Sequence, residues 1–214
     1  MLVWFASGNL HKKKELSDIL SADIMSGDTL SSAQKSIELI IPSEAGIDFD
    51  PEETGSSFLE NALLKAAALH KLLEERRPSA YNRGDPVIAD DSGLCVDALD
   101  GRPGIHSARY GGKELSAAEK NALLLSELGG SKQRSGRFVC AMILYYGPDH
   151  FYAAQETLEG ELVNSAGAGA GGFGYDPILY IPELGRTVAE LSDEEKNRIS
   201  HRGKAARAIG RFLC

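Results

Sequence analysis

The sequence predicts an α/β protein in which helices pack on a mixed β-sheet. Two short apolar runs, residues 2–6 and 86–89, are bounded by polar, Gly or Pro residues, as is typical of buried strands. A helical apolar pattern over 58–73 separates them. Residues 137–146 and parts of 150–163 are strongly β-prone and are joined by Gly-Pro-Asp, which predicts a hairpin. Helices alternating with early strands, followed by an antiparallel pair, favour a mixed sheet.

Length and composition fit one globular domain over residues 1–214. The chain is 43% hydrophobic and 25% charged, which is ordinary for a folded protein that buries a sizeable core. Asp and Glu number 31 against 23 Lys and Arg, which gives a formal net charge of −8. Proteins that bind nucleic-acid backbones usually carry a basic excess, so no nucleic-acid partner is expected. A small anionic ligand is compatible with this charge, because basic side chains can gather locally.

The cysteines and the N-terminus favour a cytoplasmic protein with no membrane partner. Cys95, Cys140 and Cys214 are odd in number and widely spaced, so they predict neither a disulfide framework nor a metal-binding pair. The first two lie in apolar runs and are expected to be reduced core residues. The apolar run at the N-terminus is too short for a signal peptide, and no segment is long enough to span a membrane.

The N-terminal half is predicted to alternate strands and helices. Ser7-Gly8-Asn9 ends the first strand and a helical pattern follows it. A strand is expected near 37–41, and Ser57-Phe58-Leu59-Glu60 is a capping box that starts the next helix. The polar segment 74–85 is predicted to be an exposed loop. The apolar face of the second helix comprises Phe58, Leu59, Ala62, Leu63, Ala66, Leu69 and Leu73.

The rest of the chain is predicted from turn and capping signals. After Asp90 and Asp91, a Ser-Gly turn and a short strand at 94–98 are expected. Capping boxes at 116–119 and 192–195 start two further helices, the first of which ends near Gly129-Gly130. Residues 167–174 form a glycine-rich loop.

Asp90 and Asp91 are the most informative pair of residues in the chain. Burying two adjacent carboxylates without compensation costs several kcal/mol, so a cation must offset them or they lie at a wet strand end. Clustered acids commonly hold a divalent metal in sites that handle phosphates, and Glu53 can join such a cluster. A solvated Asp-Asp-Ser-Gly turn is the open alternative.

Three features are candidates for binding phosphate. Residues 7–12 join a strand end, a Gly turn and a helix N-terminus, whose N–H groups and dipole favour anions; the alternative is a plain turn with an Asn cap. Ser57, Asn61 and Lys65 share one helix stripe that can face a cleft, although a solvated stripe is commoner. Arg109 can neutralise the acids or hold phosphate.

Two features are candidates for binding a flat base. Residues 171–177 place glycines on both sides of Phe173, a ring that can stack on a base for roughly 1–3 kcal/mol, and Asp176 can accept from a base edge. The alternative is a flexible loop with one aromatic anchor. Residues 196–204 gather several donors that can bind a purine carbonyl or a phosphate; the alternative is an ordinary cationic helix surface.

Taken in order, these segments resemble the inosine/xanthosine triphosphate pyrophosphatase (Ham1-like) family. The matching motifs are Ser-Gly-Asn-x-x-Lys, Glu-Thr-Gly-x-x-Phe-x-Glu-Asn-Ala-x-x-Lys-Ala, Ala-Asp-Asp-Ser-Gly-Leu, Pro-Gly-Ile-x-Ser-Ala-Arg-Tyr, Gly-Gly-Phe-Gly-Tyr-Asp-Pro and Lys-Asn-x-Ile-Ser-His-Arg-Gly. Any one motif is weak, but six in the same order leave little room for coincidence.

The resemblance implies a long central mixed sheet flanked by helices, in two lobes around a substrate cleft, and a homodimer. It implies Mg²⁺-dependent hydrolysis of ITP, dITP and XTP to the monophosphate and pyrophosphate, which cleanses the nucleotide pool. Asp91 would accept a proton from the attacking water, and Glu53, Asp91 and Asp90 would hold the metal. The substrate-binding residues would be Ser7, Gly8, Asn9, Leu10, His11, Lys12, Lys65, Ser92, Phe173, Gly174, Tyr175, Asp176, Lys196, His201 and Arg202.

Selection of the base would follow from hydrogen bonding. A buried donor aimed at a 6-oxo group is left unpaired by the 6-amino group of adenine, which is a strong rejection mechanism. Two alternatives are a pyrophosphatase for modified pyrimidine or methylated nucleotides, and a sensor that binds nucleotide without cleaving it. The complete set of acids argues against the sensor. Segments 155–160 and 164–170 depart from the family pattern, so no contact is assigned to them.

Overall fold

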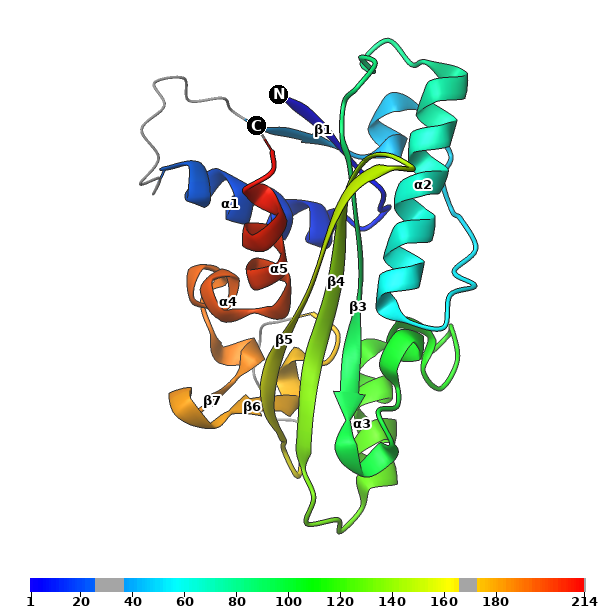
Figure 1. Ribbon diagram of the computed structural model, residues 1–214. Coiled ribbons are helices and arrows are strands. Elements are labelled where there is room, and N and C mark those ends of the chain that lie inside the picture. Colours follow the sequence, from blue (N-terminus) through cyan, green and yellow to red (C-terminus); the bar gives the residue numbers. More distant parts are fainter. Residues whose placement is uncertain (26–36, 166–172, 214) are drawn as a thin grey trace. The chain divides into compact units, whose positions relative to one another are not determined.

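The strands of the computed structural model form one seven-stranded mixed sheet in the order β2-β1-β3-β4-β5-β6-β7 (Figure 1). The structure describes residues 1–25, 37–165 and 173–213. The strands are β1 (Leu2–Phe5), β2 (Glu38–Ile40), β3 (Val87–Val96), β4 (Ser135–Gly147), β5 (His150–Leu162), β6 (Leu179–Ile181) and β7 (Arg186–Thr187). The α-helices are α1 (Leu10–Met25), α2 (Phe58–Arg76), α3 (Ala117–Leu128), α4 (Asp193–Ile199) and α5 (His201–Gly210).

The pairing of the strands confirms the predicted mixed sheet. β1 runs parallel to both of its neighbours, with Leu2 opposite Glu38 of β2 and Trp4 opposite Val87 of β3. β6 runs antiparallel to β5 and to β7. β4 and β5 are neighbours joined by the two-residue turn Pro148-Asp149, as expected for the hairpin.

The chain divides into two compact units. Unit 1 comprises Met1–Asp91, Cys140–Glu156 and Arg202–Cys214, and unit 2 comprises Ser92–Val139 and Thr157–His201. β3, β4 and β5 therefore contribute residues to both units. A single domain over residues 1–214, and a cleft between two lobes, stay predictions.

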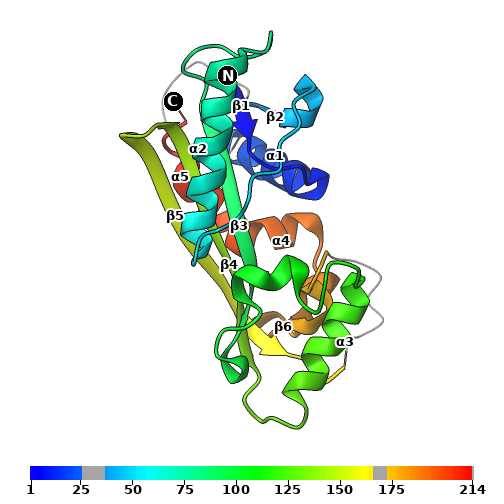
Figure 2. The same cartoon turned by 90° about the vertical axis from the view of Figure 1, so that its right-hand side faces the viewer.

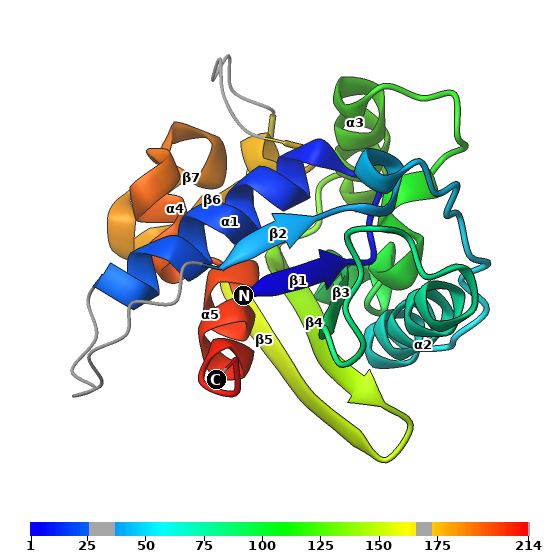
Figure 3. The same ribbon diagram turned by 90° about the horizontal axis from the view of Figure 1, so that it is seen from above.

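Unit 1 has helices on both faces of its strands, with α2 on one face and α1 and α5 on the other (Figures 1 and 3). The core on the α1 side gathers apolar residues of β1, β3 and β4 with those of the two helices. Its members include Val3, Phe5, Leu16, Ile19, Leu20, Ile88, Cys140, Met142, Leu144, Ala205, Ala206 and Ile209. Cys140 is buried as predicted, whereas Cys95 in β3 is only half-buried.

Unit 2 has a core of its own, built around α3 and the strand ends (Figure 2). Leu124 and Leu128 of α3 pack with residues of β3, β4, β5 and β6. The remaining members include Leu94, Val96, Phe138, Leu158, Leu162, Tyr175, Ile178 and Leu179.

The capping signals locate the helix starts correctly. Ser116 and Glu119 of α3, and Ser192 and Glu195 of α4, form reciprocal capping boxes. At the start of α2, only one of the two hydrogen bonds of the predicted capping box is present. The Ser57 hydroxyl accepts from the Glu60 backbone N–H, but the Glu60 carboxylate binds the N–H and hydroxyl of Ser56, at 2.6 and 2.7 Å. Ser56 therefore takes the place that the backbone N–H of Ser57 has in a full capping box.

Three local predictions are wrong. Ser92 and Gly93 form no turn, and no separate strand starts at 94, because β3 runs unbroken with paired strands on both sides. α2 continues to Arg76, so the polar loop starts three residues later than expected. Leu59, placed on the apolar face, is exposed. Most of the predicted glycine-rich loop, 167–174, lies outside the described residues.

Within the described ranges, no helix is both long and apolar enough to cross a bilayer. The longest, α2, carries acidic and basic side chains along its length.

Candidate active site

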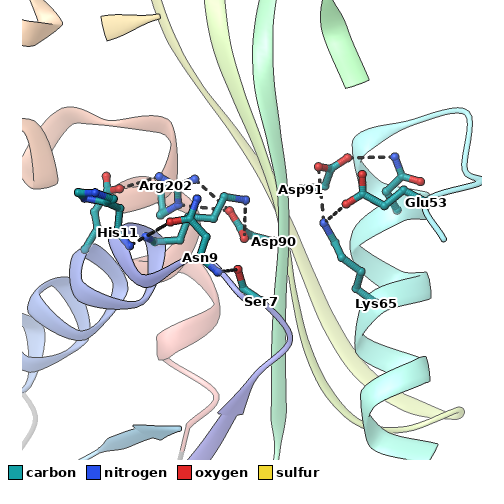
Figure 4. Close-up of polar contacts among 11 residues, drawn as sticks. Ser7, Asn9, His11, Glu53, Lys65, Asp90, Asp91 and Arg202 are labelled. Carbon is teal, nitrogen blue, oxygen red and sulfur yellow. Dashed lines mark hydrogen bonds and ion pairs between the residues drawn. The ribbon is translucent and has the colours of Figure 1, made fainter. Parts of the chain in front are cut away.

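Asp90 and Asp91 point to opposite faces of β3 (Figure 4). Successive side chains of a strand alternate between the two faces of a sheet, so adjacent carboxylates cannot share one pocket while the strand stays regular. Asp90 lies on the α1 side and Asp91 on the α2 side. The two acids consequently have separate sets of partners.

Asp90 is held by two cations in the interior of unit 1. Its Oδ1 accepts from Lys12 Nζ at 2.9 Å, and its Oδ2 accepts from Arg202 Nη2 at 3.0 Å and Nε at 3.2 Å. Burial alone would raise the pKa of Asp90, but the charges of Lys12, Arg202 and Lys65 outweigh it and hold the pKa well below its usual range. Asp90 is therefore ionised at neutral pH.

Arg202 is itself shared between two acids. Its Nη1 donates to Glu15 Oε2 at 2.6 Å, while Nε and Nη2 bind Asp90. These contacts form a continuous chain of ion pairs. It runs from Glu15 in α1 to Arg202 in α5, then to Asp90 in β3 and back to Lys12 in α1.

Asp91 shares one cation with Glu53 on the other face. Lys65 Nζ lies 2.6 Å from Glu53 Oε1 and 3.6 Å from Asp91 Oδ1, and Asn61 Nδ2 donates to Asp91 Oδ2 at 3.0 Å. Burial raises the pKa of Asp91, Glu53 adds to this rise, and Lys65 and Asn61 oppose it. Burial lowers the pKa of Lys65, but its three acidic neighbours outweigh this and raise it.

Asn61 connects the Glu53 loop to Asp91. Its Oδ1 accepts from the Gly55 N–H at 2.8 Å while its Nδ2 binds Asp91. A Cβ at Gly55 would lie 2.7 Å from that Oδ1 and 2.9 Å from the Asn61 backbone nitrogen. Only glycine fits here, which explains why this residue follows Glu-Glu-Thr in the sequence.

The turn between β1 and α1 has the cap expected of it. Asn9 Oδ1 accepts from the backbone N–H groups of His11 and Lys12, at 2.9 and 3.2 Å, and the Asn9 N–H donates to Ser7 Oγ. A Cβ at Gly8 would meet nothing within 4 Å, and Leu10 is exposed. The turn thus presents an open surface, with Lys12 directed to Asp90.

The donor set on the Asp91 face fits a hard divalent cation. Two carboxylates, Glu53 and Asp91, lie within ion-pair distance of Lys65, and burial raises the pKa of Asp91. Mg²⁺ is typically held by one or two carboxylates, with waters and substrate phosphates completing its octahedron. Among the described residues, no group of three His, Cys, Asp or Glu side chains could hold a metal.

The geometry does not bring Asp90 to this face, contrary to the expectation that it joins Glu53 and Asp91 around a metal. Both of its oxygens are occupied by Lys12 and Arg202. The physical reason is the alternation of side chains along β3.

The residues expected to bind the base belong to unit 2. Asp176 Oδ2 accepts from the Phe173 N–H and from Lys196 Nζ, both at 2.7 Å. The Tyr175 hydroxyl donates to the Ser107 carbonyl at 2.9 Å. Phe173 is 54% exposed. Asp176 thus connects the Phe173–Asp176 loop to Lys196 of α4, and Tyr175 connects it to Ser107.

The remaining predicted residues lie as follows. His201 is buried and stacks on Phe138, with ring centroids 5.0 Å apart. Ser92 follows Asp91 in β3 and is half-buried. Arg109 contacts His106 through Nη2 and Nδ1 at 3.0 Å, and the arginine that neutralises Asp90 is Arg202.

Sequence reasoning missed the roles of Glu15 and Asn121. Glu15 binds Arg202, and Asn121 Nδ2 donates to the Gly174 carbonyl at 3.1 Å. A signal for Asn121 existed, because it is a polar residue on the apolar face of α3, beside the buried Leu124 and Leu128. No local signal pairs Glu15 with a residue 187 positions away.

Fold and site together define an α/β protein that gathers acids and lysines on both faces of one central strand. The chain belongs to the Ham1 family, whose model matches residues 3–212. The predicted family resemblance is thereby confirmed.

Several relatives are similar along the chain. The dITP/XTP pyrophosphatase of Treponema denticola is 46% identical over 216 residues, covering all of this chain and 98% of the relative. That of Geobacillus kaustophilus is 50% identical over 158 residues, covering 73% and 72%. The solved Ham1 protein of Staphylococcus aureus has a TM-score of 0.79 at 39% identity, covering 100% of this chain and 98% of its own.

Proposed function

We propose that this protein hydrolyses non-standard purine nucleoside triphosphates (ITP, dITP and XTP) to the monophosphate and pyrophosphate. The observation that carries the proposal is the Glu53–Lys65–Asp91 group, in which two carboxylates share one lysine beside a buried amide. The names of the relatives support it, since proteins called dITP/XTP pyrophosphatases match this chain over 98% and 72% of their own lengths.

Glu53 and Asp91 would hold Mg²⁺, and Lys65 would bind a phosphate. Such an ion would supply charge stabilisation for the leaving pyrophosphate and would help to orient water. Asp91 accepts the proton of the attacking water.

The triphosphate binds the residues of unit 1, at the turn over Ser7–Lys12. The N–H groups at the start of α1 and the positive end of its dipole favour an anion there. Lys12 forms an ion pair with Asp90, which balances part of the lysine charge and holds its ammonium group in a fixed place. Asp90 is a positioning residue in this account, and Arg202 secures it from the opposite side.

The base binds the residues of unit 2. Phe173 stacks on the ring system, and Lys196 and His201 contribute donors for a 6-oxo group, as do backbone N–H groups of the Phe173–Asp176 loop. Adenine would leave such donors unpaired, which gives the discrimination against ATP.

The finer expectations for the assembly and its location belong to the same proposal. The protein acts on free nucleotides as a cytoplasmic homodimer with no nucleic-acid partner. The net charge of −8 supports the last point.

The test of the proposed chemistry is Asp91→Asn, with product analysis by chromatography. The unmodified protein is expected to convert ITP to IMP and pyrophosphate, and the variant to lose about 10²–10⁴-fold in kcat with an unchanged circular dichroism spectrum. Asp149→Asn, at the exposed hairpin turn, is the matched control. Turnover of Asp91→Asn within tenfold of the unmodified protein, or release of orthophosphate instead of pyrophosphate, would overturn the proposal.

A further inference from the structure

Asn121 places a polar amide in the apolar core of unit 2. It lies on α3 on the same side as Leu124 and Leu128, and it is 3% exposed. Burying an Asn side chain destabilises the fold unless its polar groups are hydrogen-bonded, and an apolar side chain at this position would avoid that loss of stability. The amide therefore calls for an explanation beyond packing.

Among the described residues, the side-chain amide makes one hydrogen bond, and that bond goes to the Phe173–Asp176 loop. Asn121 Nδ2 donates to the Gly174 carbonyl at 3.1 Å, and the residues are 53 positions apart. Its Oδ1 is buried without a hydrogen-bond partner among the described residues. An acceptor that is left unpaired in the core reduces the stability of the fold. We therefore look for the role of Asn121 in the hydrogen bond that its Nδ2 makes.

That contact fixes the orientation of one peptide group. In a trans peptide the C=O and the following N–H point in opposite directions, so a fixed Gly174 carbonyl also fixes the direction of the Tyr175 N–H. Gly174 has φ +63°, a conformation that glycine adopts readily and in which the peptide can rotate at little cost. The Asp176 N–H donates to the Phe173 carbonyl at 3.2 Å across this peptide, but that bond does not engage the Gly174 carbonyl itself.

The neighbouring residues of the loop have anchors of their own. Tyr175 is held through its hydroxyl by the Ser107 carbonyl, and Asp176 holds the Phe173 N–H and Lys196. Ser107 is in turn fixed by the Leu94 N–H and the Gly104 carbonyl. Asn121 thus supplies the restraint that these contacts leave missing, at the Gly174 peptide.

We propose that Asn121 is a positioning residue for base selection: it sets the Gly174–Tyr175 peptide so that this backbone presents its donor to the 6-oxo group of the substrate base. This inference rests on the proposed function and deepens it. It assigns to α3, which contributes no residue to the expected base site, a role in substrate discrimination.

The test compares kcat/KM for ITP with kcat/KM for ATP in Asn121→Leu. Leucine has the same number and branching of side-chain heavy atoms and lacks both polar groups. We expect the ITP-to-ATP ratio to fall about tenfold, through a higher KM for ITP and a smaller change in kcat. The midpoint of urea unfolding should stay the same or rise, because the unpaired Oδ1 is gone. A purely structural role would instead lower the midpoint and leave the ratio unchanged.

Two further variants isolate the donor. Asn121→Asp has the same shape without the N–H and should lower the ratio as leucine does, whereas Asn121→Gln keeps a donor and should restore much of it. If Asn121→Leu fails to fold, this pair carries the test. Ser126→Ala, on the exposed face of α3, is the control. Equal ratios in Asn121→Asp, Asn121→Gln and the unmodified protein would overturn the inference.

Failure of the proposed function has a different signature, since the unmodified protein would then release no pyrophosphate from ITP. In that case the ratio of the dissociation constants for ITP and ATP, measured by calorimetry, decides on Asn121. A ratio that falls in Asn121→Asp supports the inference, and an unchanged ratio overturns it.

Discussion

At the scale of single residues, Asp90 and Asp91 differ because a step of one position along β3 reverses the face of the sheet. Asp90 gains two cations and a depressed pKa, whereas Asp91 shares one lysine and has a raised pKa. The sequence shows two identical side chains in a row. Asp90 is a buried anion that supports the structure, and Asp91 is the candidate base. This difference depends on partners as far as 112 positions away in the sequence.

Asp90 is expected to be essential for stability. Asp90→Asn leaves Lys12 and Arg202 in the interior without their shared counter-charge, and breaking a buried ion pair typically costs about 3–5 kcal/mol. Urea unfolding followed by fluorescence of the buried Trp4 measures the loss. Asp18→Asn, which removes an exposed pair with Lys14, should change stability by about 0.5 kcal/mol or less. Equal losses in the two variants would contradict the account.

At the scale of elements, α2 and the loop before it position the acid–lysine group. Asn61 and Lys65 lie one turn apart and are both buried, so the stripe predicted from their spacing faces inward rather than solvent. Gly55 lets the loop approach Asn61 closely enough for a hydrogen bond of 2.8 Å. The contact explains how Glu53, eight residues before Asn61, reaches the same lysine as Asp91.

A side chain at position 55 should therefore disturb the site more than the fold. In Gly55→Ala the new methyl group would meet Asn61 Oδ1 and the Asn61 backbone, so the loop must move and Glu53 with it. We expect kcat for ITP to fall at least tenfold, since small misplacements of catalytic groups cost about 10²-fold. Gly130→Ala, where a Cβ meets nothing within 4 Å, is the control. Full activity in Gly55→Ala would show that the loop tolerates displacement.

At the scale of the whole molecule, local signals located most elements, and motif order selected the residues of the candidate site. Capping boxes and apolar periodicity predicted α3, α4 and the start of α2, because they act within a few residues. The Ser92-Gly93 turn was wrong since paired strands on both sides of β3 overrode a local preference. The partners of Asp90 and Gly174 were beyond prediction, because they join segments that only the fold brings together.

The measurement that tests the central claim most directly is pyrophosphate release from ITP, XTP, ATP and GTP, each with Mg²⁺ and with a chelator. The account predicts release that requires the metal and strongly favours ITP and XTP over ATP and GTP. No release from ITP or XTP, or release that persists in chelator, would contradict it, and the family membership would then speak for the fold alone.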